Sequence, residues 1–394
     1  MMNNMTDMNG ASMFLMDLAS GTSVNPVAWR MPMIMTHYGD WNAMFMAIGF
    51  LSDIQQSGPR GRDKLYSTNW LMASAEHRAG ADGAFEAELM LSLEPATITD
   101  RRYPLLFQTG ETAYGVPLVD AQHPHNFIMS LGFHYAYQFG GSATLDLYAA
   151  PVGDPALGPT AYPHRASAME LPQAPISHHW QDSTHIADDV VTAGIQIRKI
   201  KLEASGFHGA EPGENRWTVE AGPIDSWATR LWWLPTKNWA AQISFGRIAH
   251  PEALEPGDQT RATASVEYVR PMRGSSWASS LIWGRTHNTA SLHNLNSYLA
   301  ESVLPLSRRN LITGRFELVD KDDLFEGQLA GRVFRIGEYT VGYTRDIPLF
   351  AYVATGIGAN FSAYNAPSAI RPYYGSHPVG GNVFVRFRLQ QRER

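Results

Sequence analysis

The sequence predicts a single all-β domain, an antiparallel barrel of about 16 strands, with 12 or 14 strands as the alternatives. Three observations predict this fold. Apolar and polar residues alternate along many segments, and the connections between those segments are alternately short and long. Charged residues are only 17% of the 394-residue chain, and aromatic residues are 11%. A meander with short turns at one end, long loops at the other and an apolar outer face is the plan of a bacterial outer-membrane barrel.

Composition excludes several other classes of protein. The chain has no cysteine, which excludes disulfides, thiolate metal sites and a cysteine nucleophile. No segment approaches the roughly 18 consecutive apolar residues of a transmembrane helix. The net charge of −6 gives no reason to expect nucleic-acid binding.

The alternation is clearest in "AFEAELMLSLE", residues 84–94. Phe85 and Leu89 fall on one face of the extended chain, whereas Glu86 and Glu88 fall on the other, which is typical of a strand with one apolar and one polar face. Similar patterns predict strands at 42–56, 65–78, 84–94, 126–139, 143–151, 187–198, 201–209, 224–234, 238–249, 259–271, 275–287, 295–307, 310–320, 331–346, 349–361 and 380–391.

The connections alternate in length along the whole chain. Short turns are expected at 80–83, 140–142, 199–200, 235–237, 271–274, 308–309 and 347–348. Long loops are expected near 57–64, 95–125, 152–186, 210–223, 250–258, 288–294, 321–330 and 362–379. We therefore expect residues 41–394 to form the barrel, and residues 1–40 to form a Met-rich N-terminal extension or plug.

A barrel in a membrane must close on itself, because hydrocarbon cannot satisfy backbone N–H and C=O groups. Its lumen, however, can carry charge. We expect the lumen to be lined by Glu86, Glu88, Asp146, Glu203, Arg315, Glu317, Arg386 and Arg388. We expect interfacial aromatic girdles to include Trp41, Trp232, Trp233, Trp239 and Trp283. The alternative is a soluble all-β protein with a solvated outer face, which the low charge and abundant aromatics disfavour.

Two histidine-rich stretches, "DAQHPHN" (120–126) and "SHHWQDSTH" (177–185), each close a long loop at the same end of the barrel. We therefore expect them to be neighbours in space. Imidazole nitrogens bind zinc, copper and nickel well, so the stretches form a candidate copper or zinc site. Its members are Asp120, His123, His125, His178, His179, Asp182 and His185, with Asp188 and Asp189 as further carboxylates. The alternative is hydrogen-bonded packing of two ordered loops, because Asp and His side chains commonly cap turns and Pro124 stiffens its segment.

Methionine is concentrated near the N-terminus. Of the 16 methionines, 11 lie within the first 46 residues: Met1, Met2, Met5, Met8, Met13, Met16, Met31, Met33, Met35, Met44 and Met46. Thioethers favour Cu(I), and "MPMIMTH" (31–37) offers three of them beside an imidazole. The alternative is that these flexible side chains fill irregular apolar gaps.

Several stretches carry a family resemblance. "EPATITDRRYPLLFQTGETAYG", "DAQHPHNF", "HHWQDSTHIADD" and "GFHGAEPGENRW" are similar to those of a family of Gram-negative outer-membrane proteins to which no function is assigned. The last expected strand, "NVFVRFRLQ", resembles the C-terminal strand of such proteins, although the chain continues through "QRER". The resemblance covers about residues 40–250 and implies a barrel in the bacterial outer membrane, with a signal peptide already removed. It supplies no catalytic residues.

The function we expect is porin-like passage or uptake of a small solute through a lumen that loops partly occlude. Its selectivity would be set by Glu86, Glu88, Asp146, Glu203, Arg315 and Arg386. The alternatives are a metal-binding outer-membrane protein and a structural barrel of an envelope assembly. We expect no enzyme, because Ser177 or Ser183 beside His178 or His185 lacks a nucleophile-elbow motif. Expected partners are lipid, a small solute, and a second copy of the chain or an envelope protein.

Overall fold

The computed structural model describes residues 8–272 and 274–391. Within them, sixteen antiparallel strands form one closed barrel. These strands are β2 (Trp41–Gln56), β3 (Asp63–Ala79), β4 (Gly83–Leu91), β7 (Ile128–Phe139), β8 (Ala143–Gly153), β9 (Ala187–Ile197), β10 (Ile200–Phe207), β11 (Ser226–Thr236), β12 (Trp239–Ile248), β13 (Gln259–Met272), β14 (Ser275–Asn288), β15 (Asn294–Ser307), β16 (Asn310–Lys321), β17 (Phe334–Ile347), β18 (Val353–Asn365) and β19 (Val379–Leu389).

The predicted fold class and strand number are confirmed. The largest boundary difference is at β18, expected at 349–361 and observed at Val353–Asn365. One of the expected long loops contains helices and strands that were not predicted. Residues 95–125 contain α2 (Glu94–Thr97), η2 (Thr99–Arg101) and a hairpin of β5 (Tyr103–Ala113) with β6 (Val116–Gln122), which forms a separate two-stranded sheet.

The barrel closes where the last strand meets the first. β19 pairs with β2 from Gly380 opposite Gln56 to Arg388 opposite Ile48. A further short strand, β1 (Ile34–Tyr38), pairs with residues 41–45 of β2, beyond the end of β19. Both edges of β2 are thereby paired along most of its length, which leaves little open sheet edge at the seam.

The two faces of the wall have opposite chemistry. In β4, Glu86 and Glu88 are buried inside the barrel, whereas Leu89 is exposed on the outer face. Large apolar side chains continue around the outer face of β11–β17, among them Leu231, Ile243, Val266, Leu281, Phe316 and Val341. This is the face that a lipid-embedded barrel needs.

One expected girdle residue was wrong. Trp41, Trp233 and Trp239 are exposed on the outer face, but Trp232 is fully buried and its Nε1 donates to Glu203 Oε2 at 3.0 Å. Successive residues of a strand point to opposite faces, so Trp232 and Trp233 cannot both face outward.

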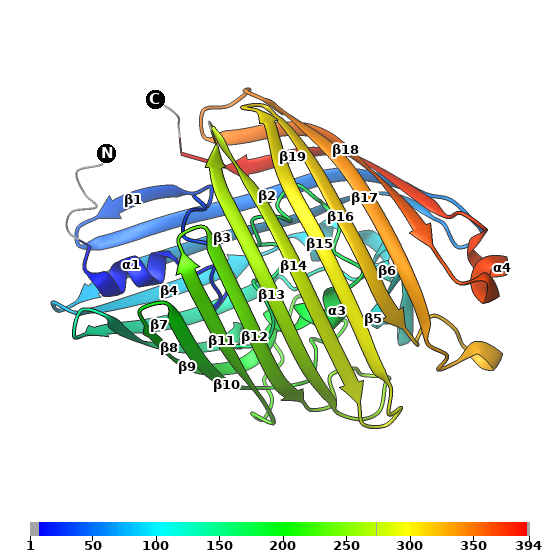
Figure 1. The fold of residues 1–394 in the computed structure, drawn as a ribbon, viewed down its shortest axis with the longest axis horizontal. Helices are drawn as coiled ribbons and strands as arrows, with labels where there is room; N and C mark the ends of the chain where they lie inside the picture. Colours follow the sequence, from blue (N-terminus) through cyan, green and yellow to red (C-terminus); the bar gives the residue numbers. More distant parts are fainter. Residues whose placement is uncertain (1–7, 273, 392–394) are drawn as a thin grey trace.

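Figure 1 shows the strands tilted side by side, with α4 (Arg371–Tyr374) at one end and β1 at the opposite end. The connections at the α4 end are the long ones, and those at the β1 end are short turns such as the one between β9 and β10. Among the described residues, no helix combines the length and the apolar character needed to cross a membrane.

The N-terminal segment packs against the inner side of the wall. Helix α1 (Gly10–Met16) is capped by Asn9 and buries Phe14 and Leu15 against Ala84 of β4 and Ala136 of β7. Further along, Lys201 Nζ donates to the carbonyl of Thr22 at 2.7 Å. The part of residues 1–40 that follows Met8 therefore includes a segment inside the barrel, whereas residues 1–7 lie outside the described residues.

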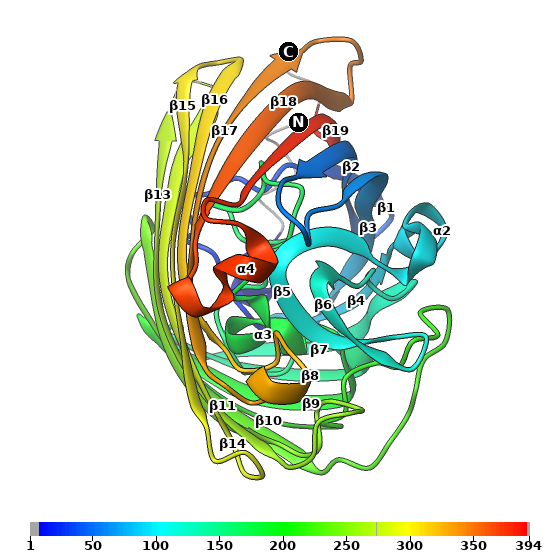
Figure 2. The same cartoon turned by 90° about the vertical axis from the view of Figure 1, so that its right-hand side faces the viewer.

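The connection between β8 and β9 is a long buried segment. Every residue from 154 to 186 except Ser183 is buried. This stretch, which we name the plug loop, contains α3 (His178–Gln181) and η3 (Ser183–His185). Figure 2, seen from the α4 end, shows α3 and the β5–β6 hairpin within the outline of the ring of strands, with α4 toward the viewer.

Candidate functional site

The plug loop is held to the wall by buried ion pairs. Arg165 of the loop is fully buried, and its Nε lies 2.6 Å from Glu301 Oε1 on β15. Its Nη1 donates at 2.8 Å to Asp182 Oδ2 and at 2.8 Å to the carbonyl of Thr160, both within the loop. Arg315 on β16 is the second partner of Glu301, at 3.0 Å. One charged network thus links the plug loop to two strands.

A second network holds the loop to the seam of the barrel. Glu170 pairs with Arg386 and with Arg388 on β19. Gln173 exchanges two hydrogen bonds of 3.0 Å with Asn360 on β18, Nε2 to Oδ1 and Nδ2 to Oε1. These contacts fix the loop on a different side of the barrel from Glu301.

The expected lumen charges all lie on the inner face of the wall, where they contact other protein groups. Lys201 Nζ pairs with Asp146 at 3.1 Å and with Glu203 at 3.0 Å. Glu88 accepts from Ser130 Oγ at 2.6 Å, and Glu86 is buried on the same strand. Arg315 and Arg386 are the plug anchors described above. Most of the charges expected to set selectivity are thus bound to other side chains inside the barrel.

The two histidine stretches lie side by side. The ring centroids of His123 and His179 are 5.6 Å apart, and those of His125 and His185 are 5.5 Å apart. His178 lies 5.2 Å from both His179 and His185. The strand order therefore brings "DAQHPHN" and "SHHWQDSTH" together, as the loop positions predicted.

Most members of the expected metal set use their ring nitrogens in hydrogen bonds within the protein. His125 Nδ1 lies 2.9 Å from Glu94 Oε2, and its Nε2 lies 3.2 Å from the Tyr162 hydroxyl. His178 Nδ1 contacts Asp182 Oδ1 at 2.6 Å, and His185 Nδ1 contacts the carbonyl of Asp182 at 2.8 Å. These three rings follow the packing alternative.

The expected carboxylate ligands are also occupied. Asp120 accepts from Arg60 Nη1 at 3.0 Å and from the backbone N–H of Phe107 at 2.8 Å. Asp182 holds Arg165 and His178. His123 faces another carboxylate, with Nε2 3.1 Å from Glu111 Oε1. The seven residues expected as one site are thus divided among several separate contacts.

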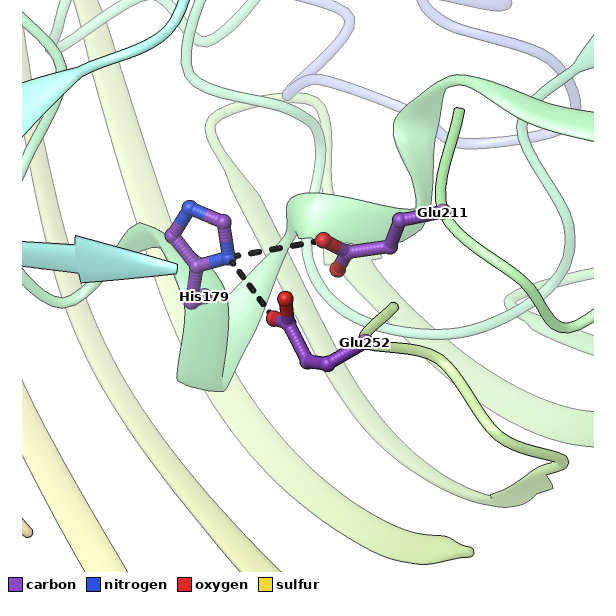
Figure 3. Close-up of side chains that lie close together, drawn as sticks. All are labelled: His179, Glu211 and Glu252. Atoms are coloured by element: carbon purple, nitrogen blue, oxygen red, sulfur yellow. Dashed lines mark ion pairs between the residues drawn. The ribbon is translucent and has the colours of Figure 1, made fainter. Parts of the chain in front are cut away.

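His179 differs from the other histidines. It is 7% exposed, and neither of its ring nitrogens has a hydrogen-bond partner. Its Nδ1 faces Glu211 Oε2 and Glu252 Oε1, each 3.8 Å away. Figure 3 shows the imidazole and the two carboxylates converging on one space. Among the described residues they form a group of three potential metal ligands whose donor atoms lie within 4.8 Å of one another.

Three loops build this group. Helix α3 carries His179 and is fixed to the wall because Ser177 donates from both its N–H and its hydroxyl to Glu317 Oε2, at 2.8 and 2.6 Å. Glu211 lies between β10 and β11, and Glu252 lies between β12 and β13. The backbone N–H of Glu211 donates to the carbonyl of Pro251 at 2.9 Å, which sets the two glutamates next to each other.

Burial governs the ionisation of the three groups, all of which lie in loops outside the wall strands. Burial lowers the pKa of His179 well below its usual range, and the neighbouring His178 and His123 lower it further. Burial raises the pKa of Glu252 well above its usual range, and repulsion from Glu211 adds to the shift. The pKa of Glu211 is raised to about 7, again mainly by burial. The imidazole is therefore neutral at pH 7.

A cavity of about 1170 Å³ opens beside this group at the long-loop end, and His179 and Glu252 both line it. Its charged lining has twice as many acidic as basic side chains: Asp63, Asp100, Asp120, Glu252, Glu255, Asp322, Asp323 and Glu326 against Arg60, Arg62, Lys64 and Arg102. We name this space the outer cavity. Its charge favours cations over anions.

Sequence reasoning missed Glu211 and Glu252. Each stands in a long loop at the same end as the histidine stretches, close behind another histidine, in "HGAE" (208–211) and "HPE" (250–252). That signal was available, but it does not reveal which of the many loop carboxylates point inward.

The methionine-rich segment divides between two environments. Met31 and Met33 pack against a buried apolar cluster that includes Met46, Met72 and Met90. His37, at the end of the "MPMIMTH" run, is exposed on β1 and contacts Asn42. The packing of Met31 and Met33 follows the gap-filling alternative.

The serines considered for catalysis are bound elsewhere. Ser177 Oγ donates to Glu317, as described above, and Ser183 Oγ accepts from Arg261 Nη1 at 2.9 Å. Neither hydroxyl is hydrogen-bonded to His178 or His185 among the contacts of the described residues.

Known proteins resemble this chain in fold. No protein-family model matches the chain, and no curated protein matches it. Among solved structures, an anion-selective porin from Comamonas acidovorans superposes with a TM-score of 0.55 at 10% identity, covering 88% of this chain and 99% of that one. OmpF of Salmonella typhi gives 0.54 at 8% identity, covering 90% and 100%.

The barrel has the porin fold. OprB of Pseudomonas putida, with a TM-score of 0.53 at 9% identity, covers 89% of this chain and 94% of its own. At such identities the similarity extends to the fold alone.

Proposed function

We propose that this porin-fold barrel resides in the bacterial outer membrane and admits small solutes, cations in preference to anions, through a lumen that the plug loop closes. The observation that carries the proposal is the combination of a closed barrel with an apolar outer face and an acidic outer cavity directly outside a buried plug. A role as a non-enzymatic channel accords with the porin fold.

The plug loop supports a gated passage over a permanently open one. It is anchored at two separated places, by Arg165 to Glu301 and by Glu170 to Arg386 and Arg388. Passage of a solute past the middle of the lumen therefore requires these ion pairs to separate. The acidic lining of the outer cavity would concentrate cations in front of that barrier.

The test is ion conductance across a planar lipid bilayer. The wild-type barrel should show rare, brief openings. The double variant Arg165→Ser/Glu170→Ser removes both anchors and should raise the open time at least tenfold. A matched control, Arg335→Gln, cuts the pair with Asp320 between two wall strands and should behave like the wild type.

Two results would overturn the proposal in different ways. A steady, large current through the wild type would show that the plug does not close the lumen. A sealed bilayer with the wild type and with a folded double variant would exclude solute passage and favour a structural role. Gel mobility with and without heating reports whether each variant is folded.

A further inference from the structure

We propose that His179, Glu211 and Glu252 bind one divalent transition-metal ion of the zinc type in the wall of the outer cavity. The site goes beyond the passage of solutes, since an ion can bind there while the plug loop stays closed. Only His179 belongs to the set of ligands that the sequence predicted.

The spacing of the donor atoms suits a small cation. Zinc lies about 2.0–2.2 Å from nitrogen and oxygen ligands, which places tetrahedral donors roughly 3.4 Å apart. His179 Nδ1 lies 3.8 Å from Glu211 Oε2 and 3.8 Å from Glu252 Oε1. A contraction of a few tenths of an ångström along these two edges, with an approach of the two carboxylates, whose donor atoms lie within 4.8 Å of each other, would close the three ligands around an ion.

The state of His179 is the second and independent observation. Its imidazole is more than nine-tenths buried, has no hydrogen-bond partner at either nitrogen, and points its Nδ1 at the two carboxylates. Burying a polar group without a partner is unfavourable by roughly 1–3 kcal/mol. A bound cation would remove this penalty by accepting the nitrogen lone pair. Each of the other histidines of the two stretches has at least its Nδ1 in a hydrogen bond within the protein.

The surroundings hold the three ligands in place. The backbone N–H of Glu111 donates to Glu252 Oε2 at 2.9 Å, so the other oxygen, Oε1, is the one turned to His179. Gly110, with φ +112°, packs on the imidazole so closely that a Cβ there would lie 2.5 Å from His179 Cε1. Such outer contacts orient ligands in metal sites.

The ligand chemistry selects the class of ion. A neutral imidazole with two carboxylates suits zinc and similar borderline ions, whereas calcium and magnesium prefer oxygen ligands alone. Two carboxylates balance the charge of one divalent ion. Arg261 is a competing cation, because it lowers the pKa of both glutamates, but its guanidinium donates to Ser183 Oγ at 2.9 Å and to Gln259 Oε1 at 3.3 Å. His179 and Glu252 line the outer cavity, which leaves a fourth position facing it.

The experiment is calorimetric titration of the folded full-length chain in detergent micelles with Zn²⁺, after removal of metal by EDTA. We expect one ion per chain. His179→Gln and Glu252→Gln should each weaken binding at least tenfold. Glu255→Gln is the matched control, because Glu255 lines the same cavity outside the ligand group, and it should change affinity less than twofold.

Two results would overturn the proposal. One is the absence of zinc binding by the folded wild type. The other is an equal loss of affinity in Glu252→Gln and Glu255→Gln, which would indicate diffuse attraction to an acidic cavity. Since the titration involves no bilayer, its failure would leave the conductance test of the proposed function unaffected.

A second measurement identifies the imidazole ligand. Co²⁺ in a tetrahedral site gives visible absorption bands. These bands should appear when the wild type is titrated with Co²⁺ and should be absent in His179→Gln. Excess Mg²⁺ or Ca²⁺ should not displace the bound Co²⁺, so the bands should remain. If His179→Gln fails to fold, loss of the bands in Glu252→Gln tests the site through its carboxylate ligand. Bands that persist in the folded variants would contradict the assignment.

Discussion

The middle of the lumen and the outer cavity treat buried charge in opposite ways. In the middle, Arg165 is shared between Asp182 and Glu301, and Arg386 lies against Glu170. At the cavity wall, Glu211 and Glu252 lie beside each other and a neutral imidazole. The plug loop contributes to both regions, through Arg165 and His179. Its partners in the middle stand on wall strands, whereas those at the cavity wall stand in two other loops, and the regions differ in how their charges are paired.

The difference in pairing distinguishes charges that stabilise the fold from charges that we propose bind a metal ion. Removing one partner of a buried ion pair leaves an uncompensated charge in a medium that solvates it poorly. Among the described residues, Glu211 and Glu252 form no ion pair with a lysine or arginine, and an added cation would offset the charge that they carry when ionised. Pairing therefore predicts the sign of a mutation's effect: loss of stability in the middle, and little loss or a gain at the cavity wall.

The largest effect is expected for Arg165→Met. This change keeps the length of the side chain but leaves Glu301 and Asp182 each with one partner fewer, and we expect a loss of about 3–5 kcal/mol in the free energy of unfolding. The measurement is equilibrium denaturation in detergent micelles. Arg335→Gln is the control, because its half-exposed guanidinium pairs with Asp320 near the surface, where an ion pair contributes about 0–1 kcal/mol. Equal losses in the two variants would remove the distinction.

The wall of the barrel was predictable from sequence because membrane and lumen impose strict alternation on every strand. Glu86 and Leu89 reveal their faces by spacing alone. The β5–β6 hairpin was not predictable in this way. The first seven residues of β5 are buried on both faces, Phe107 and Glu111 have positive φ, and the register with β6 is irregular. Apolar and polar residues therefore do not alternate along this strand.

The candidate site could be predicted only in part, for a related reason. Loop lengths were enough to bring His123 next to His179. Whether a histidine ring nitrogen is left without a partner depends on contacts that sequence spacing does not encode, such as that of Glu94 with His125. The pairing of Glu211 with Glu252 depends likewise on one backbone hydrogen bond between two loops. Trp232 was placed wrongly because aromatic residues suit both the girdle and the inner face.

Asp154 provides a pH test within the plug loop. Its carboxylate accepts from Ser20 Oγ at 2.8 Å, and burial raises its pKa from 3.8 to about 7 against the attraction of Arg230. The folded state therefore binds this proton more tightly than the unfolded state. The resulting stability is complete below about pH 4 and is lost as the pH rises through 7, by at most about 4 kcal/mol.

The measurement is the midpoint of thermal unfolding at pH 5 and pH 8 for the wild type and for Asp154→Asn, whose amide oxygen still accepts from Ser20. The wild type should lose more stability than the variant between these two pH values. If the two proteins respond identically to pH, Asp154 does not titrate in this range, and its charge is balanced as well as those of the other plug residues.

The smallest effect, and the one of opposite sign, is expected for Glu211→Gln without added metal. Above pH 7 the change removes one of two neighbouring buried carboxyl groups. Burial raises the pKa of both groups, and repulsion from Glu211 raises the pKa of Glu252 further. Because an amide avoids that repulsion and fills the same volume, stability should stay constant or rise by about 1 kcal/mol. With Zn²⁺ added, the order should reverse, since the ion stabilises only a folded chain that retains its ligand. If Glu211→Gln in the metal-free protein loses as much free energy of unfolding as Arg165→Met, Glu211 holds the loops together. The distinction between paired and unpaired buried charges would then be wrong for Glu211.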